Sequence, residues 1–164
     1  MPRRPESVLV LVYNRDGQVL LLRRSKPFDF WQSITGSLDP DENHAAAAAR
    51  ELAEETGLCD PVRLHYSGVS RQFTIDPRWQ DRYPQGVREN VEYEWHYVLD
   101  AACDVRLAAD EHSEYQWLPV AEAIDTVWSW TNRDALRTLA TRLTVGLTIG
   151  LRTGQTTCSA TSAT

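Results

Sequence analysis

Residues 43–57, NHAAAAARELAEETG, carry the strongest secondary-structure signal in the chain and predict a helix over 43–56. Alanine has the highest helix propensity, Asn43 is a suitable N-cap, and Gly57 suits the left-handed residue that often ends a helix. A start at Asp39 is the alternative, because the next residue is a proline and a glutamate follows three positions on. We favour Asn43, since residues 39–41 are equally typical of a turn.

The predicted helix has two chemically different sides. An apolar stripe, expected to pack on a sheet, consists of Ala45, Ala49, Leu52 and Thr56. Glu51, Glu54 and Glu55 fall on another side, three and four residues apart, where like charges destabilise a helix by roughly 0.2–0.5 kcal/mol per pair. Only Arg50 stands close enough to offset them, so a bound cation is the expected compensation.

The segments around this helix predict one α/β domain. Strand-like runs lie at 8–13, 18–24, 62–75, 91–101 and 115–120, and residues 131–143 form an amphipathic helix. The first two runs flank the turn sequence NRDG and predict a hairpin. We expect a single domain over 1–144 and a weakly ordered Thr/Gly/Ser-rich tail over 145–164.

Composition excludes several kinds of protein. The net charge of −6 argues against a nucleic-acid-binding surface, although an acidic protein binds phosphate compounds when metal ions supply the positive charge. Three widely separated cysteines form no zinc motif and indicate a reducing, cytoplasmic setting. The apolar run after the N-terminus is too short for a secretion signal, and no segment reaches the roughly 20 apolar residues of a membrane span.

A longer pattern, G-x5-E-x7-R-E-L-x-E-E-x-G-L, includes the loop before the helix. Its fixed positions are Gly36, Glu42, Arg50, Glu51, Leu52, Glu54, Glu55, Gly57 and Leu58. The pattern resembles the Nudix box with every defining position filled, although Ile34-Thr35-Gly36 replaces the Pro-Gly-Gly of many members. The resemblance implies a Nudix hydrolase with an α/β/α sandwich around a central mixed β-sheet, which cleaves phosphoanhydrides with Mg²⁺ or Mn²⁺.

The carboxylates of the box suit that chemistry. Mg²⁺ prefers carboxylate, carbonyl and water oxygens, so Glu51, Glu54 and Glu55 are candidate metal ligands. Bound ions neutralise phosphate oxygens and activate water, and Glu54 is therefore also a candidate catalytic residue. Arg50, four residues before Glu54, is expected to steady that carboxylate as part of the catalytic machinery.

Three positions of the loop are assigned through the same resemblance. Glu42 is expected to support the loop, and the family pattern also allows it to approach a metal. The main-chain carbonyl near Thr35 is a further expected ligand. Gly36 is interpreted as structural, at a turn before the helix.

Glu111 is the candidate general base or additional metal ligand, because it directly precedes the last strand-like run. The alternative is a surface acidic cluster with Asp110 and Glu114. His96 and His112 have no convincing partner pattern and are interpreted as structural.

The flanking segments indicate a substrate class. FDFWQSITGS, RYPQGV, EHSEYQWL and SWTNRDAL, within residues 5–143, resemble the bacterial Nudix subgroup that acts on dihydroneopterin triphosphate. That resemblance implies removal of pyrophosphate from the pterin triphosphate in folate synthesis. A flat apolar slot is then expected to hold the ring, with Phe30, Trp31, Tyr83 and Trp130 as candidates. Core packing is the alternative for each aromatic residue.

Candidates for binding the triphosphate are Arg71, Arg82 and Arg88, with solvated surface positions as the alternative. Other interpretations remain open: a Nudix enzyme acting on (d)NTPs, an RNA 5′-end pyrophosphohydrolase, or a binding module without catalysis. The acidic net charge argues against the RNA reading, and the full set of carboxylates argues against the binding module. The sequence does not predict an oligomeric state.

Overall fold

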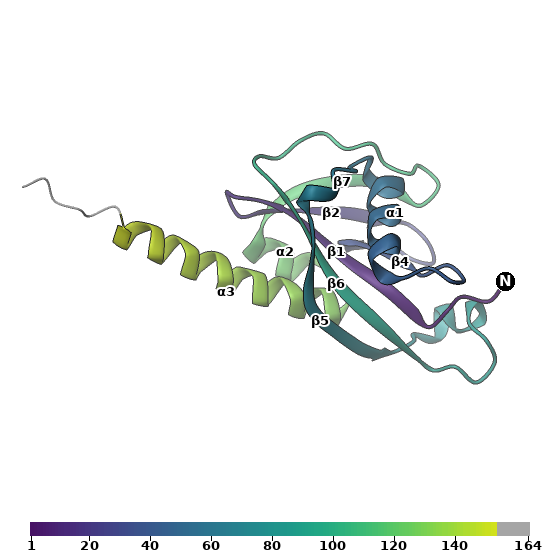
Figure 1. Cartoon of the computed structure of the whole chain (residues 1–164). Coiled ribbons are helices and arrows are strands. Elements are labelled where there is room, and N and C mark those ends of the chain that lie inside the picture. The colour runs from purple at the N-terminus through teal and green to yellow at the C-terminus, as the bar shows by residue number, and fades with distance from the viewer. Residues whose placement is uncertain (154–164) are drawn as a thin grey trace, which may run out of the picture.

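The computed structural model describes residues 1–153, and residues 154–164 lie outside this description (Figure 1). In chain order the elements are β1 (Glu6–Asn14), β2 (Gln18–Arg24), β3 (Phe30–Gln32), β4 (Ile34–Ser37), α1 (His44–Thr56), η1 (Pro61–Arg63), β5 (Leu64–Thr74), η2 (Pro77–Arg82), β6 (Glu89–Leu99), β7 (His112–Pro119), α2 (Val120–Thr126) and α3 (Trp130–Thr153). All five predicted strands form. The short strands β3 and β4 occupy a segment that we expected to be a loop or a short strand.

The strands form one mixed sheet of seven strands, in the order β3-β2-β1-β6-β5, with β4 paired to β1 and β7 paired to β2. Strand β1 is central: it runs parallel to β6 along its whole length and antiparallel to β2 and β4. The predicted hairpin forms between β1 and β2, where the Asn14 side chain accepts hydrogen bonds from the backbone N–H groups of Asp16 and Gln18. Asn14 therefore holds the turn that sets the register of the hairpin.

Both faces of the sheet are covered, which explains the almost continuous apolar sequence of β1. On one face, the alternate residues Val8, Val10 and Val12 pack in a core that includes Leu52 of α1. On the other face, Leu9 and Leu11 pack in a core with residues of α2 and α3. The predicted α/β/α sandwich with a mixed sheet is confirmed.

Helix α1 begins and ends as predicted. The Asn43 side chain accepts a hydrogen bond from the N–H of Ala46 at 2.8 Å, and Gly57 ends the helix with φ 78°. The expected buried stripe is wrong in part, because Ala45 and Ala49 are exposed, whereas the buried alanines are Ala47 and Ala48. A run of five alanines has no preferred side, so sequence alone does not determine which alanines face the sheet.

Helix α2 was not expected. It has seven residues, follows Pro119, and has no side-chain N-cap, so it lacks the signals that mark longer helices. Helix α3 includes the predicted amphipathic segment, with Ala135, Leu136 and Leu139 buried. It continues to Thr153, past the expected domain boundary at Thr144, and extends beyond the sheet (Figure 1). Weak order in residues 154–164 stays a prediction.

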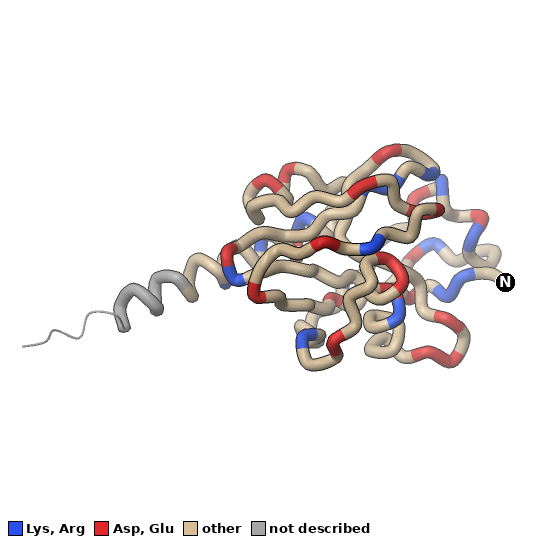
Figure 2. The backbone as a smooth tube through the Cα atoms, turned by 90° about the horizontal axis from the view of Figure 1, so that it is seen from above, with Lys and Arg blue, Asp and Glu red and all other residues tan. Residues whose placement is uncertain are grey.

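Acidic and basic positions are interspersed along the described chain, with several basic positions near the N-terminus (Figure 2). Within residues 1–153, no helix combines the length and apolar content required to cross a membrane.

Candidate active site

Strand β4 approaches α1 closely at Gly36. A Cβ atom at this position would lie 2.0 Å from the Glu51 carboxylate, so only glycine leaves room for that carboxylate beside the strand. Gly36 pairs with Val8 of β1, on the sheet face that α1 covers. Gly36 thus has a specific structural role, because it lets the Glu51 carboxylate approach strand β4 closely.

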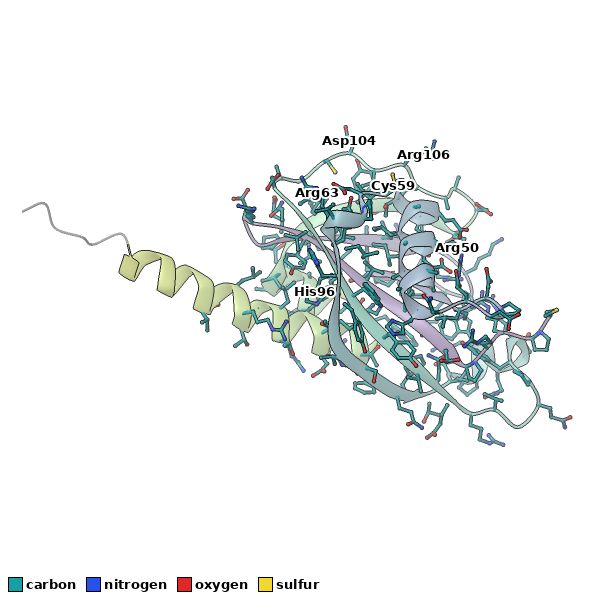
Figure 3. The ribbon with its side chains drawn as sticks, in the orientation of Figure 1. Arg50, Cys59, Arg63, His96, Asp104 and Arg106 are labelled. Carbon is teal, nitrogen blue, oxygen red and sulfur yellow. The ribbon has the colours of Figure 1, made fainter. Side chains whose placement is uncertain are left out.

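Arg50 of α1 connects the helix to the preceding loop (Figure 3). Its guanidinium donates two hydrogen bonds to Glu42, at 2.9 and 2.8 Å, one to Glu51 at 2.7 Å, and one to the Ser37 carbonyl at 3.0 Å. The Arg50 guanidinium also holds the pKa of Glu42 below its usual range. The expected partner Glu54 is more distant, at 3.4 Å. Arg50 therefore positions Glu42 and Glu51 more directly than it positions Glu54.

The three glutamates of α1 have different surroundings. The side chain of Glu55 is 3 % exposed, that of Glu51 is 13 % exposed, and that of Glu54 is 60 % exposed. Burial raises the pKa of Glu51 to about 7 and also raises the pKa of Glu55. Glu54 therefore faces solvent, and among the described residues Glu55 is the only one of the three in a group whose potential ligand atoms lie within 4.8 Å of one another.

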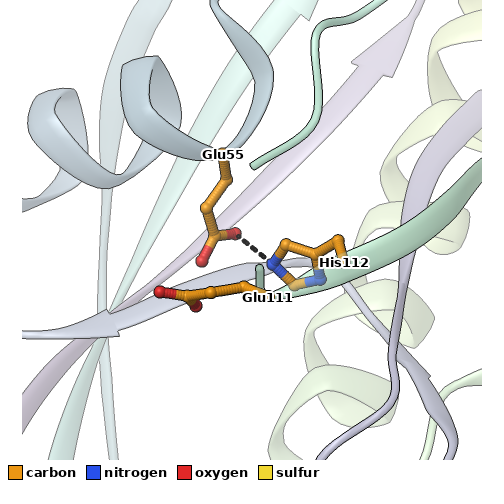
Figure 4. Close-up of side chains that lie close together, drawn as sticks. All are labelled: Glu55, Glu111 and His112. Atoms are coloured by element: carbon orange, nitrogen blue, oxygen red, sulfur yellow. Dashed lines mark ion pairs between the residues drawn. The ribbon is translucent and has the colours of Figure 1, made fainter. Parts of the chain in front are cut away.

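Glu55 instead joins two residues at the start of β7, Glu111 and His112 (Figure 4). One potential ligand atom from each residue lies within 4.8 Å of the others. Glu55 and His112 approach to 3.4 Å, yet no hydrogen bond reaches the carboxylate oxygens of Glu55 or the ring nitrogens of His112 from the described residues. Burying a carboxylate without hydrogen bonds costs folding free energy unless a cation lies beside it. The Glu55, Glu111 and His112 side chains therefore fit a divalent metal ion.

The sequence gives no direct indication that His112 lies beside Glu55. The two residues are far apart in the sequence, and the pairing arises only when β7 lies next to the C-terminal end of α1. The one signal in the sequence is that His112 directly follows Glu111, a candidate metal ligand.

A first cavity, the carboxylate cavity, has a volume of about 450 Å³ and includes Glu51 and Glu111 in its lining. Its wall also contains Thr35 and Gly36 of β4. Basic side chains complete it: Arg3, Arg4 and Arg24.

A second cavity, the aromatic cavity, has a volume of about 550 Å³. Its aromatic lining comprises Phe30, Phe73, Trp79, Tyr83, Trp128 and Trp130. The rings of Phe30 and Trp128 lie 5.3 Å apart between centroids, and those of Trp79 and Trp128 lie 5.5 Å apart. Side chains from β3, η2 and the start of α3 therefore form an apolar wall suited to a flat ring.

The two cavities are continuous. Five residues line both of them: Arg3, Arg24, Thr35, Gly36 and Ser37. An elongated molecule can therefore extend from the aromatic wall, past two arginines, to the carboxylates. Arg3 and Arg24 were not among the predicted phosphate-binding residues, because an arginine near the N-terminus or at the end of a strand carries no distinguishing pattern.

The predicted substrate residues divide into two groups. Phe30, Tyr83 and Trp130 line the aromatic cavity. The remaining candidates, which line neither cavity, are Trp31, Arg71, Arg82 and Arg88. Trp31 packs instead against the core beneath α2 and α3, because successive residues of a strand point to opposite sides.

Arg71 is occupied by ion pairs. Its guanidinium donates to Glu94 at 2.5 Å and to Asp134 at 2.7 Å, and it thereby links β5, β6 and α3. Nearby, the Asn132 side chain accepts from the Ser33 N–H at 2.8 Å and donates to the Ser33 hydroxyl at 2.9 Å. These contacts fix the start of α3 against the β3–β4 connection and thus shape the aromatic cavity.

Comparison with known proteins is consistent with this geometry. A model of the NUDIX domain matches residues 3–139. Dihydroneopterin triphosphate diphosphatase of Escherichia coli is 35 % identical over 139 residues, which cover 82 % of this chain and 91 % of the relative. The protein of the same name from Haemophilus influenzae is 30 % identical over 136 residues, which cover 80 % and 85 % of the two chains.

A comparison with solved structures finds a relative with the same activity in its name. The E. coli dihydroneopterin triphosphate pyrophosphohydrolase superposes with a TM-score of 0.78 at 33 % identity, covering 84 % of this chain and 96 % of that one. The family expected from the pattern over residues 36–58 is thereby confirmed. The chain belongs to the NUDIX family of hydrolases.

Proposed function

We propose that the protein hydrolyses dihydroneopterin triphosphate to dihydroneopterin monophosphate and pyrophosphate, with Mg²⁺ as the metal and Mn²⁺ as a substitute. The proposal includes a small-molecule substrate and a cytoplasmic setting, which the exposed free thiols of Cys59 and Cys103 suit. Relatives that carry the name of this activity cover most of the chain.

One observation carries the proposal: the continuity of the aromatic and carboxylate cavities through five shared residues. A pterin triphosphate has a flat ring at one end and a polyanion at the other. The aromatic wall suits the ring, and the opposite end offers carboxylates that suit metal-bound phosphates.

Glu55 and Glu111 would hold the metal, together with Glu51, which lines the same cavity as Glu111. The carbonyl near Thr35 and the Glu54 carboxylate are the further proposed ligands. When bound, the ion neutralises phosphate oxygens and makes water a better nucleophile.

The residues of the chain perform the remaining tasks. Arg3 and Arg24 lie between the two cavities, where their charges attract the triphosphate. Arg50 fixes the Glu51 carboxylate through its 2.7 Å hydrogen bond. Glu111, exposed at the carboxylate cavity, serves either as the additional metal ligand or as the general base that accepts the proton of the attacking water.

The proposed reaction is the hydrolysis of one phosphoanhydride bond. A water oxygen forms a bond to phosphorus while the anhydride bond between the α- and β-phosphates breaks. Pyrophosphate leaves, the monophosphate remains on the pterin side chain, and the water proton passes to a carboxylate.

The test is a comparison of kcat/KM for dihydroneopterin triphosphate and a panel of NTPs and dNTPs, with Mg²⁺, with Mn²⁺ and with a chelator. We expect metal-dependent release of pyrophosphate, fastest from the pterin. Equal or faster turnover of a nucleotide would overturn the substrate while keeping the hydrolytic chemistry. Metal-dependent binding without turnover on any substrate would instead favour a binding module.

A further inference from the structure

The aromatic cavity contains polar atoms whose hydrogen bonds are unmet. Glu92 of β6 and Gln32 of β3 both line it, and the two residues are 6 % and 8 % exposed. Neither Glu92 Oε1 nor Gln32 Nε2 has a hydrogen-bond partner among the described residues. Buried polar atoms in a native protein are normally satisfied, so an unpaired acceptor and an unpaired donor in one cavity indicate a ligand that supplies their partners.

Glu94, two residues further along the same strand, provides an internal contrast. It is also buried, but Arg71 donates to it at 2.5 Å and His96 lies 2.6 Å away. The Arg71 guanidinium is the positive charge near both glutamates, and it is paired with Glu94 and Asp134. Glu94 has a structural role in a closed network, whereas Glu92 keeps a free oxygen at the cavity.

Burial accordingly raises the pKa of Glu92 to about 7, against the opposing effects of the Thr131 hydroxyl and Arg71. A carboxylate kept in such a place costs stability, and this cost is characteristic of residues retained for binding.

The hydrogen-bonding groups of Glu92 indicate which edge of a ring fits beside it. A 2-amino-4-oxopyrimidine edge, present in pterins and in guanine, offers a ring N–H and an exocyclic amino group side by side. A carboxylate offers two acceptor oxygens at a matching spacing, and because each oxygen has two lone pairs, the Glu92 oxygen beside the Thr131 hydroxyl can accept a second donor next to the unpaired Oε1. Adenine offers an acceptor beside its amino group and therefore leaves one carboxylate oxygen facing a lone pair.

We infer that Glu92 is the residue that selects the ring of the substrate, by accepting the paired N–H donors of a 2-amino-4-oxopyrimidine edge in the aromatic cavity. Gln32 Nε2 supplies a donor for an acceptor elsewhere on the ring. This inference rests on the proposed function for the identity of the natural substrate, but the selected edge does not depend on it, because guanine nucleotides share that edge.

The test compares kcat/KM for dihydroneopterin triphosphate, dGTP and dATP in the parent protein and in Glu92→Gln. Loss of a hydrogen bond to a charged group predicts a decrease of roughly 10- to 100-fold for the pterin and guanine substrates. Turnover of dATP is expected to stay the same or to rise. Glu89→Gln, at an exposed position of the same strand, is the matched control and should leave all three values unchanged.

A second readout isolates the ring from the phosphates: binding of unphosphorylated dihydroneopterin to the chelator-treated protein. Glu92→Gln should weaken this binding by a similar factor. An equal loss on all three triphosphates, or unchanged pterin turnover and binding, would overturn the role of Glu92.

The outcomes also separate the two proposals. If the parent prefers dGTP to the pterin and Glu92→Gln removes the preference for dGTP over dATP, the proposed substrate is wrong and the selected edge is right. If the parent prefers the pterin to both nucleotides and Glu92→Gln keeps the full preference for the pterin over dATP, the proposed function stands and the inference about Glu92 fails.

Discussion

The carboxylate cavity and the aromatic cavity are continuous, yet the chain builds them in different ways. The wall of the carboxylate cavity combines residues of the Nudix box and the loop before its helix, such as Gly36 and Glu51, with distant residues such as Arg24 and Glu111. The carboxylates of α1 themselves lie within the 23 consecutive positions 36–58. The aromatic cavity collects its wall from β1, β3, β5, η2, β6 and the start of α3. In the proposed function, the first cavity serves a reaction common to triphosphates, and the second selects the ring of the substrate.

This contrast predicts two kinds of variant. Changes at the carboxylate cavity, or at the neighbouring carboxylates of α1, should reduce turnover of every triphosphate by the same factor. Changes at the aromatic cavity should alter the ratio between substrates.

The largest effect is expected for Glu55→Gln. Replacing this buried carboxylate with a neutral amide removes a proposed metal ligand, and kcat should decrease by about 10³-fold on pterin and nucleotide substrates alike. Turnover with Mg²⁺ and circular dichroism check the effect and the fold. Glu122→Gln, exposed on α2, is the control. Turnover within tenfold of the parent would contradict the metal role of Glu55.

Glu54→Gln should be the next most severe change. The sequence pattern makes Glu54 a metal ligand, whereas its side chain is 60 % exposed and lies outside the Glu55–Glu111–His112 group. We expect a folded protein with at least about 10²-fold lower kcat. If the variant keeps most of its turnover, metal binding is confined to the buried side of α1.

Gly36→Ala tests the close approach of β4 to Glu51. The added methyl group must displace the Glu51 carboxylate, and a displacement of about 1 Å in an active site costs up to roughly 10²-fold in rate. Because the displaced atoms end a flexible side chain, Tm should change little. Gly146→Ala, where a Cβ meets no atom within 4 Å, is the control. A large decrease in Tm with unchanged kcat would show that Gly36 matters only for folding.

The last expected effect is on stability rather than on rate, and it concerns the aromatic cavity. Burial raises the pKa of Glu92 from 4.5 to about 7, with Thr131 and Arg71 opposing and Glu94 assisting. Since the folded pKa is the higher one, the folded state binds more protons between these values, and the free energy of unfolding decreases as pH rises from 4.5 to 7. Glu92→Gln removes this decrease.

The variant should therefore match the parent near pH 4 and be more stable at pH 8, by up to about 3 kcal/mol. Urea unfolding of both proteins at the two pH values, without metal, measures the difference. An identical difference at both pH values would show that Glu92 does not titrate as the cavity requires.

The two cavities also differ in how far the sequence predicted them. The helix, its caps and its carboxylates follow from the 3.6-residue period and from local capping, both of which act within a few residues. Phe30, Tyr83 and Trp130 line the aromatic cavity, whereas Trp31 packs against the core on the other side, because the side to which a strand residue points depends on the register of its strand. Their role in binding a pterin stays a prediction. The candidates for binding the triphosphate, Arg71, Arg82 and Arg88, line neither cavity, and Arg71 is instead paired with acidic residues distant in sequence.

The sequence by itself thus determined the fold class, the family and the helix that carries the carboxylates, since local spacing encodes all three. Tertiary structure alone decided which carboxylate is buried, that His112 stands beside Glu55, that Arg3 and Arg24 lie between the cavities, and that Glu92 is left without a partner. Burial and pairing depend on which strands and helices meet, and segments far apart in the chain meet only in the folded protein.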